Sequence, residues 1–368
     1  MKRSHRQFFI MTAQLPLMIE IDGSVGEGGG QVLRVCLALS ALTGESVAIK
    51  NIRINRATPG LRKQHVTAIR AAAEVASATV SGVTIGSSEI TFSPSGRRGG
   101  TFYFDTRTAG STMLILQALL PVLAFADRHA SVTLVGGTNN PMAPQVDYVI
   151  NVLNPTLAFM GFGYELRLVR RGFYPRGGGV VEVFTDPIGA IRPINVVKMG
   201  SILGIKGVSH SRNLPTHVVE RQAKAATQRC SRAGYQSIAI ALDAGQKVVS
   251  PSTGSGVVLW TETSTGGRLG GDALGARSKP AEQVGAEAAA NLLAELSAGA
   301  PLDAHLADQL VVWLALANGR SKIKTAALTL HAVTAMVVTE TLTGCEFKTH
   351  GKIGVPGTIE CRGNIALG

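Results

Sequence analysis

The feature that most constrains this chain is a secondary-structure pattern that recurs three times along it. Each copy reads as strand, helix, strand, helix, strand, strand. In the first helix, Leu33, Leu37 and Ala41 share one face, which is the spacing of an amphipathic helix. Recurrence of one supersecondary unit is typical of repeat-built folds. The pattern predicts an α/β fold with a large domain of three repeated β-α-β-α-β-β units.

The predicted elements of the three copies follow from hydrophobic periodicity and turn residues. The first copy comprises strand 18–22, helix 31–42, strand 47–52, helix 62–75 and strands 78–83 and 89–92. The second comprises strand 101–105, helix 111–126, strand 131–135, helix 145–160 and strands 164–169 and 180–184. The third comprises helix 303–317, strand 322–327, helix 330–341 and strands 345–348 and 358–361.

The third copy is interrupted by a stretch with its own strands and helices. Its predicted elements are strands 201–208, 237–242 and 256–262 and helices 216–233 and 280–297. This stretch reads as a small inserted α/β domain. The predicted division is a tail (1–17), repeats one and two of the large domain (18–186), the inserted domain (187–300) and the third repeat (301–368).

The amino-acid composition indicates which class of partner the protein binds. The 36 Lys and Arg residues exceed the 24 Asp and Glu residues, which gives a net charge of +12. Such an excess favours polyanions such as nucleic acid or nucleotide phosphates, although a generally basic surface is the simpler alternative. Aromatic residues make up only 5% of the chain, which argues against a long base-stacking platform and favours contact with an RNA end.

Cysteine usage and hydropathy bear on the compartment. The four cysteines include no C-x-x-C pair, so neither a zinc knuckle nor a disulfide framework is indicated, and we expect a reducing, cytoplasmic setting. The basic N-terminus lacks an apolar run of signal-peptide length, and no segment is long and apolar enough to span a membrane. The oligomeric state stays open, with a homo-oligomer as one alternative.

A glycine-rich segment at residues 26–30 joins the first strand to the first helix. Backbone amides at such a junction commonly bind phosphate, although tight turns use glycine as well. The segment matches neither the P-loop nor the dinucleotide-binding fingerprint. Glu27 lies inside it and Arg34 one turn into the helix. A carboxylate beside phosphate-binding amides is best explained by a bridging divalent cation.

Basic residues cluster shortly afterwards, at Arg53, Arg56, Arg62 and Lys63, followed by Gln64 and His65. Guanidinium groups suit phosphate oxygens. For any single arginine a solvated surface position is the better interpretation. For the whole set of basic residues, a phosphate-binding role is the better interpretation.

The most unusual stretch is RGFYPRGGG at residues 171–179. Three glycines before a strand cost conformational entropy, so either another backbone segment or a ligand must approach closely there. The stretch resembles the signature of the RNA 3′-terminal phosphate cyclase family. GEGGGQVLR (26–34), RATPGL (56–61), GGTNNP (136–141) and LADQ (306–309) also resemble that family in order and spacing.

The resemblance covers nearly the whole chain and implies a fold and a reaction. The fold is a three-repeat large domain with a small inserted α/β (thioredoxin-like) domain. The activity is that of an ATP-dependent ligase-type nucleotidyl transferase, which converts an RNA 3′-phosphate to a 2′,3′-cyclic phosphate. It runs through a covalent histidyl-AMP and an RNA-adenylylate, releases pyrophosphate and AMP, and uses Mg²⁺ or Mn²⁺.

The resemblance also assigns residues. His331 matches the nucleophilic histidine; by itself it would read as a hydrogen-bonded core histidine. A position in the first turn of a helix favours the neutral imidazole that attack on phosphorus requires. Glu27 is implied as metal ligand. The implied phosphate and RNA ligands are Arg34, Arg53, Arg56, Gln64 and His65. The implied ATP contacts are Gln117, Pro144, His305, Leu306, Ala307, Asp308 and Gln309, with Pro144 on the adenine face.

Two positions depart from the family pattern. His305 stands where relatives often have an adenine-stacking tyrosine, so nucleotide affinity or base preference is expected to differ. Ala335 stands where a polar amide is usual, which puts the fine positioning of His331 in doubt.

Two other functions fit parts of the sequence. One is a non-catalytic ribosome-assembly or RNA-binding relative on the same scaffold. Such relatives lack the nucleophilic histidine, so the presence of His331 argues against this alternative. The other is an enolpyruvyl-transferase-like enzyme, which would need neither the insertion nor His331. The sequence leaves open which RNAs are substrates and whether DNA ends react.

Overall fold

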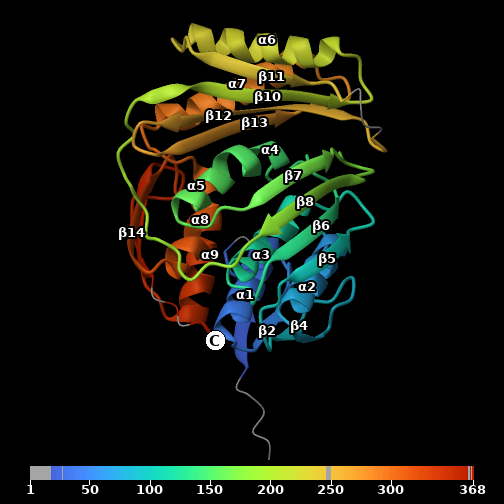
Figure 1. Cartoon of the computed structure of the whole chain (residues 1–368), viewed down its shortest axis with the longest axis vertical. Coiled ribbons are helices and arrows are strands. Elements are labelled where there is room, and N and C mark those ends of the chain that lie inside the picture. The colour runs from blue at the N-terminus through green and yellow to red at the C-terminus, as the bar shows by residue number, and fades with distance from the viewer. Residues whose placement is uncertain (1–17, 27, 246–249, 364, 366) are drawn as a thin grey trace, which may run out of the picture.

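The three predicted repeats are present as three four-stranded sheets of the same topology. Figure 1 shows the chain, with the first two repeats in blue to green and most of the third in orange to red. The structure is a computed structural model, and it describes residues 18–368 except 27, 246–249, 364 and 366. The predicted tail at residues 1–17 lies outside the described residues.

Each unit contributes four strands and its helices. Unit one comprises β1 (Ile19–Asp22), α1 (Gly30–Thr43), β2 (Val47–Lys50), α2 (Lys63–Val75), β3 (Thr79–Ser81) and β4 (Ile90–Ser93). Unit two comprises β5 (Gly100–Asp105), α3 (Thr112–Ala124), β6 (Ala130–Gly136), α4 (Val146–Tyr148), η1 (Val149–Leu153), α5 (Asn154–Phe159), β7 (Glu165–Arg170) and β8 (Gly179–Thr185). Unit three comprises β9 (Asn195–Val196), α8 (Ala304–Leu316), β14 (Gly319–Thr325), α9 (Leu330–Thr343), β15 (Phe347–His350) and β16 (Gly357–Gly363).

The strand order is equivalent in all three sheets: β1-β2-β4-β3, β5-β6-β8-β7 and β9-β14-β16-β15. In each sheet the first two strands are parallel and the remaining pairs are antiparallel. The parallel pair is joined by a helix, as a crossover between parallel strands requires. The β-α-β-α-β-β unit predicted from the sequence is therefore confirmed.

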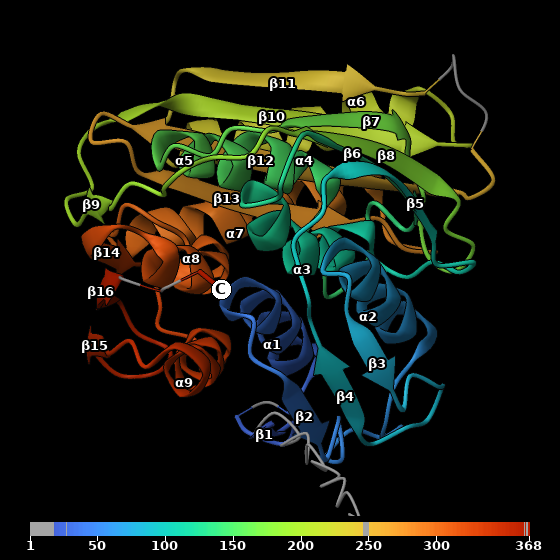
Figure 2. The ribbon, with the colours of Figure 1, turned by 60° about the horizontal axis from the view of Figure 1, so that its bottom comes forward.

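The helices of the three units pack against one another between the sheets (Figure 2). α1 contacts both α3 and α9, and α3 also contacts α8. Strands such as β6 and β8 alternate buried and partly exposed residues, which is the pattern of a sheet with one face on the core. A single apolar cluster runs through all three units. None of the described helices is long and apolar enough to cross a membrane.

The inserted domain has its own sheet and core. It comprises β10 (Ile202–Arg212), α6 (His217–Arg232), β11 (Ile238–Asp243), β12 (Gly254–Thr263), β13 (Arg268–Leu274) and α7 (Ala281–Ser297). Its sheet order is β11-β10-β12-β13, with β10 and β11 parallel and the other pairs antiparallel. β9 falls within residues 187–300, but it pairs with β14 in the third large-domain sheet.

The predicted helix over residues 145–160 differs in detail from the structure. It is continuous, but its central segment η1 is a π-helix, in which the Asn154 N–H donates to the Val149 carbonyl. Pro155 follows at the start of α5. Proline has no N–H, and its ring would crowd the carbonyl four residues earlier, so a wider turn accommodates it.

Two strands were missing from the predicted elements. β9 has only two residues, which are too few for an alternating pattern. The other is β13. Its sequence contains Gly270 and Gly271, which weaken the alternating pattern by which strands are recognised. Both glycines make room for neighbours. A Cβ at Gly270 would lie 2.5 Å from the ring of Tyr148, and one at Gly271 would lie 2.2 Å from the backbone of Leu292 in α7. Close packing between layers therefore removed the signal for this strand.

Candidate active site

The first turn of α1 lacks the side-chain cap that equivalent helices have. α3 is capped by Ser111, whose hydroxyl accepts from the Leu114 N–H, and α8 by Asp303, whose carboxylate accepts from the Leu306 N–H. α1 follows Gly29, which offers no side chain to its N–H groups. These amides need an acceptor from elsewhere, and a helix start is a favourable place for an anion.

Three donor side chains converge on this turn. A Cβ placed on Gly29 would lie 3.0 Å from Nη2 of Arg56. A Cβ placed on Gly30 would lie 2.8 Å from Nε2 of His65 and 3.0 Å from Nη1 of Arg34. We call these five residues the α1 site. Glycine at both positions leaves open the space between the helix start and the three donors, which a side chain would partly occupy.

The protonation states make the α1 site a set of donors. Burial, together with the nearby arginines, lowers the pKa of His65 to about 3, so its ring is neutral at pH 7. Nδ1 of His65 accepts from the Arg62 N–H at 3.0 Å, so the ring proton resides on Nε2, which faces Gly30. Burial lowers the pKa of Arg34 to about 10, which leaves its guanidinium charged. Such a set suits phosphate oxygens.

Two other predicted phosphate ligands hold neighbouring segments in place. Arg53 has a left-handed backbone (φ 56°), and its Nη1 donates to the carbonyls of Thr58 and Gly60 at 2.8 Å each. It thereby shapes the loop that carries Arg56. Oε1 of Gln64 accepts from the Ser111 N–H at 3.4 Å and so connects α2 to the start of α3. Gln64, His65, Arg34 and Ser111 line one small cavity.

A second cavity lies on the other side of Arg34. Nε of Arg34 donates to Oε1 of Gln117 at 2.8 Å, and both residues line this cavity together with Asp308 and Gln309 of α8. The aromatic ring of Trp313 also lines it. Three residues that the resemblance assigns to ATP, on two helices far apart in the sequence, therefore meet beside the α1 site.

His331 is the second residue of α9 and lies in its first turn, as predicted. Nε2 of Gln31, at the start of α1, donates to the His331 carbonyl at 3.2 Å. A Cβ on Gly26 would collide with Oγ1 of Thr334, so the glycine-rich segment also packs on the first turn of α9. Thr329, which caps α9, donates to Asp308. The starts of α1 and α9 thus lie together.

A comparison with protein families matches this chain to one family. The model of the RNA 3′-terminal phosphate cyclase family matches residues 25–349, a span that includes the α1 site, Asp308 and His331. The chain belongs to this family.

Curated cyclases are similar along their whole length. The RNA 3′-terminal phosphate cyclase of Caldivirga maquilingensis is 45% identical over 335 residues, covering 90% of this chain and 94% of that protein. The one of Ignicoccus hospitalis is 46% identical over 349 residues, covering 94% and 99%. The one of Methanothermobacter thermautotrophicus is 45% identical over 343 residues, covering 93% and 99%.

Not every residue assigned by the resemblance to the cyclase family lies at the two cavities. His305 is exposed on α8, and Pro144 is half-buried in the loop before α4. Leu306 and Ala307 are fully buried in the core, and their N–H groups donate to Asp303. None of the four lines either cavity.

The described part of the chain contains no complete set of metal-ligating side chains. No group of three His, Cys, Asp or Glu residues within it could hold an ion. Glu27, the predicted metal ligand, lies outside the described residues.

Gln31 belongs to the GEGGGQVLR motif, but neither its residue type nor the resemblance predicts a role for it. Its side chain is buried and connects α1 to the carbonyl of His331. The available signal was a glutamine in the first turn of a mostly apolar helix, since an amide that becomes buried there needs a partner. Trp313 was also missed, because a tryptophan in an apolar helix reads as core.

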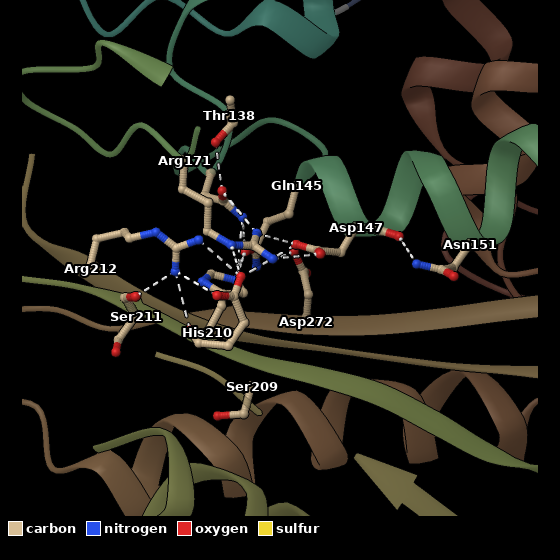
Figure 3. A network of polar contacts seen from close by, with 12 residues as sticks. Thr138, Gln145, Asp147, Asn151, Arg171, Ser209, His210, Ser211, Arg212 and Asp272 are labelled. Atoms are coloured by element: carbon tan, nitrogen blue, oxygen red, sulfur yellow. Dashed lines mark hydrogen bonds and ion pairs between the residues drawn. The ribbon is translucent and has the colours of Figure 1, made fainter. Parts of the chain in front are cut away.

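The cyclase signature at residues 171–179 lies at the contact between the two domains (Figure 3). Arg171 is buried and donates to both carboxylate oxygens of Asp147, at 2.5 and 2.8 Å, and to Asp243 of the inserted domain at 2.9 Å. A Cβ on Gly172 would lie 2.2 Å from the Gly179 backbone. Gly177 and Gly179 likewise have backbone as their close neighbour, whereas Gly178 faces the side chain of Pro251.

Proposed function

We propose that this protein uses ATP to close an RNA 3′-phosphate to a 2′,3′-cyclic phosphate. The observation that carries the proposal is the position of His331, at the start of α9 and against the start of α1, where Arg34, Arg56 and His65 converge. A nucleophile beside a cluster of anion-binding donors suits transfer of a phosphorus group. Membership in the cyclase family supplies the reaction type.

In the first step, a ring nitrogen of neutral His331 attacks the α-phosphorus of ATP. An N–P bond forms, the bond between the α-phosphorus and the bridging oxygen breaks, and pyrophosphate leaves. The ring carries a positive charge until it loses its proton. The purpose of the step is to store AMP in an activated form.

In the second step, an oxygen of the RNA 3′-phosphate attacks the phosphorus of the histidyl-AMP. The N–P bond breaks, His331 is released, and the RNA end becomes an anhydride with AMP. In the third step, the neighbouring 2′-hydroxyl attacks the RNA phosphorus and loses its proton, while AMP leaves. Because the hydroxyl is already tethered, this step needs orientation more than activation.

The α1 site and the second cavity divide the binding work in this proposal. Arg34, Arg56 and the amides at the start of α1 would neutralise phosphate charge, which is the main catalytic demand of such transfers. Gln117, Asp308 and Gln309 would contact the nucleotide. His305, Pro144, Leu306 and Ala307 are left out because they do not line the cavity.

A divalent cation is part of the proposal. Mg²⁺ or Mn²⁺ would supply charge neutralisation at the triphosphate. Such ions commonly bind through one or two carboxylates plus substrate phosphates, so a cage of protein ligands is not required. Glu27, inside the glycine-rich segment, is the carboxylate we propose for this role. We therefore expect labelling by ATP to need added Mg²⁺ or Mn²⁺.

The test is covalent labelling with α-labelled ATP in Mg²⁺ or Mn²⁺. We expect the wild-type protein to retain labelled AMP in a bond that is labile in acid and stable in alkali, as a phosphoramidate is. His331→Ala should retain none, and a metal chelator should prevent labelling of the wild type. His350→Ala, which removes an exposed histidine on β15, is the matched control and should label normally.

Absence of label on the wild type with either metal would contradict the proposal. A role in RNA binding on the same fold would then be the better explanation. Equal labelling of His331→Ala and the wild type would leave the reaction type intact but assign the nucleophile to another residue.

A further inference from the structure

The loop formed by residues 173–178 of the signature has one packed face and one exposed face. Phe173 is buried, with its ring 5.8 Å from that of His210, and its N–H donates to Ser252 of the inserted domain at 2.8 Å. The next side chain, Tyr174, is 68% exposed, and Arg176 is exposed as well. The Tyr174 ring is exposed to water although its loop is well packed, so it contributes nothing to the core. Such a ring indicates a ligand-binding position.

The backbone of this loop is fixed at several points. A Cβ on Gly177 would lie 2.5 Å from the Thr108 carbonyl, and one on Gly178 would lie 2.3 Å from Pro251. The Gly177 N–H also donates to the Phe173 carbonyl at 2.7 Å. Tyr174 and Arg176 are therefore presented by a rigid support, and little entropy would be lost when they bind something.

This support is continuous with the α1 site. Gly177 packs on residues 108–109, which belong to the loop between β5 and α3. The other end of that loop reaches α2: a Cβ on Gly110 would lie 2.9 Å from Cβ of Gln64, and the Ser111 N–H donates to Gln64. Gln64 precedes His65 of the α1 site. A connected path thus leads from the α1 site to Tyr174.

Two exposed arginines, Arg107 and Arg176, flank this path. Arg107, at the tip of the loop between β5 and α3, is exposed and has a left-handed backbone (φ 51°). Within the described part of the chain, the side chains of Arg107 and Arg176 form no ion pair. Asp105 lies close to Arg107, and its carboxylate accepts from the Arg107 N–H at 2.7 Å. We call Arg107, Tyr174 and Arg176 the ridge.

We propose that the ridge binds the RNA nucleotides that precede the reacting 3′ end. This inference rests on the proposed function, because the strand is the one whose terminal phosphate occupies the α1 site. Arg107 and Arg176 contact its phosphates, and a base stacks on the ring of Tyr174. Arginines with an interleaved aromatic ring are what single-stranded nucleic acid requires, and this contact is blind to sequence.

The experiment compares cyclisation of two 3′-phosphorylated RNAs, a dinucleotide and a dodecanucleotide. The dinucleotide ends near the α1 site, while the dodecanucleotide extends over the ridge. For Tyr174→Ala and for Arg107→Ala/Arg176→Ala, we expect kcat/KM to fall about 10-fold with the dodecanucleotide, through a higher KM. The loss should be absent with the dinucleotide. Tyr174→Phe keeps the ring and should behave as the wild type.

The salt dependence separates the two kinds of contact. Loss of two phosphate contacts in Arg107→Ala/Arg176→Ala should reduce the slope of log Kd against log salt by about 1.4, whereas Tyr174→Ala should leave the slope unchanged. Arg232→Ala is the matched control, because this exposed arginine ends α6, at the opposite end of the inserted sheet from Ser252. It should bind both RNAs as the wild type does.

The outcomes distinguish the two proposals. If the ridge variants bind and cyclise the dodecanucleotide as well as the wild type does, the proposed RNA-binding role of the ridge is wrong, while the cyclase activity stands. If the wild type cyclises neither RNA, the proposed function fails. Fluorescence anisotropy with a labelled dodecanucleotide then still tests RNA binding by the ridge. Equal Kd values for the wild type and the ridge variants would overturn that role.

Discussion

Two histidines, His65 and His210, illustrate how burial sets the chemistry of single residues. His65 faces the first turn of α1 as a neutral donor, because Nδ1 is occupied by the Arg62 N–H. His210 lies at the contact between domains, where its Nε2 is 3.0 Å from Oε1 of Gln145. Burial, together with nearby arginines, lowers the pKa of each to about 3. A charged ring at either position would have to give up much of its hydration.

These two residues predict that the protein loses stability in mild acid. In the unfolded chain a histidine titrates near pH 6.5, whereas in the folded protein it stays neutral down to about pH 3. Below pH 6.5 the unfolded chain therefore binds more protons, and stability is complete above this pH and falls as pH is lowered through this window. For each histidine, the free energy of unfolding should fall by about 1–2 kcal/mol between pH 6.5 and pH 5.

Urea unfolding at pH 7, 6 and 5 measures this effect. His65→Gln and His210→Gln should each show a shallower loss of unfolding free energy with falling pH than the wild type. Equal pH slopes in all three proteins would contradict the assignment. His129→Gln is the control, since His129 is exposed, pairs with exposed Asp186 and should leave the slope nearly unchanged.

At the scale of elements, the first helices of the three units differ in how they begin. α3 and α8 begin with a capping side chain, and α1 begins with glycine. The cost of an uncapped helix is about 1 kcal/mol, which is small compared with the burial of the rest of α1. Without a capping side chain, the amides at the start of α1 face the charged side chains of Arg34 and Arg56.

Gly30→Ala tests this use of α1. Because Gly30 is the first residue of α1, the gain in helix propensity from alanine is small, and the contact with His65 offsets it, so the free energy of unfolding should change by less than about 1 kcal/mol. The added Cβ would displace His65 and Arg34 from the helix start, so kcat/KM for RNA cyclisation should fall at least about 10-fold. Denaturant unfolding and cyclisation kinetics are measured on the same preparation.

The matched control for this substitution is Gly189→Ala, in an exposed loop where a Cβ meets nothing within 4 Å. It should change neither property. A Gly30→Ala protein that is as active as the wild type would mean that the first turn of α1 does not approach the substrate.

At the scale of the whole molecule, Arg171 connects the repeats to the insertion. Its guanidinium contacts Asp147 in unit two and Asp243 at the end of β11. Burial alone would favour a protonated Asp147, but Arg171 overcomes it and lowers the pKa of Asp147 to about 2. Asp243 is shared with Arg212. The ion pairs therefore hold the inserted domain in one orientation, with Ser252 against the signature loop.

Arg171→Met should destabilise the protein by about 3–5 kcal/mol, because it leaves the Asp147 carboxylate buried without a counter-charge. Adding Asp147→Asn should restore part of the loss, since the remaining amide carries no charge. Urea unfolding followed by fluorescence measures both. A double variant no more stable than Arg171→Met alone would mean that Asp147 is not the group left unpaired.

Much of the fold could be predicted from the sequence, because helix and strand periodicity is a local property. The three repeats, the insertion and the glycine-rich turn follow from residue types and spacing within short windows. The exceptions are β9, which is only two residues long, and β13 and η1, where a glycine pair and a proline serve contacts or geometry that a local pattern does not report.

The sequence by itself determined which chemical groups the protein has, including His331, the arginines after the first helix and the family motifs. Only the tertiary structure decided which of them meet. Gln31 reaches the carbonyl of His331 across 300 residues, and Arg34 reaches Gln117 across 83. It also decided that Leu306 and Ala307 are buried while Tyr174 is exposed. Such outcomes depend on how sheets and helices from distant parts of the chain stack, and spacing along the chain carries no measure of that.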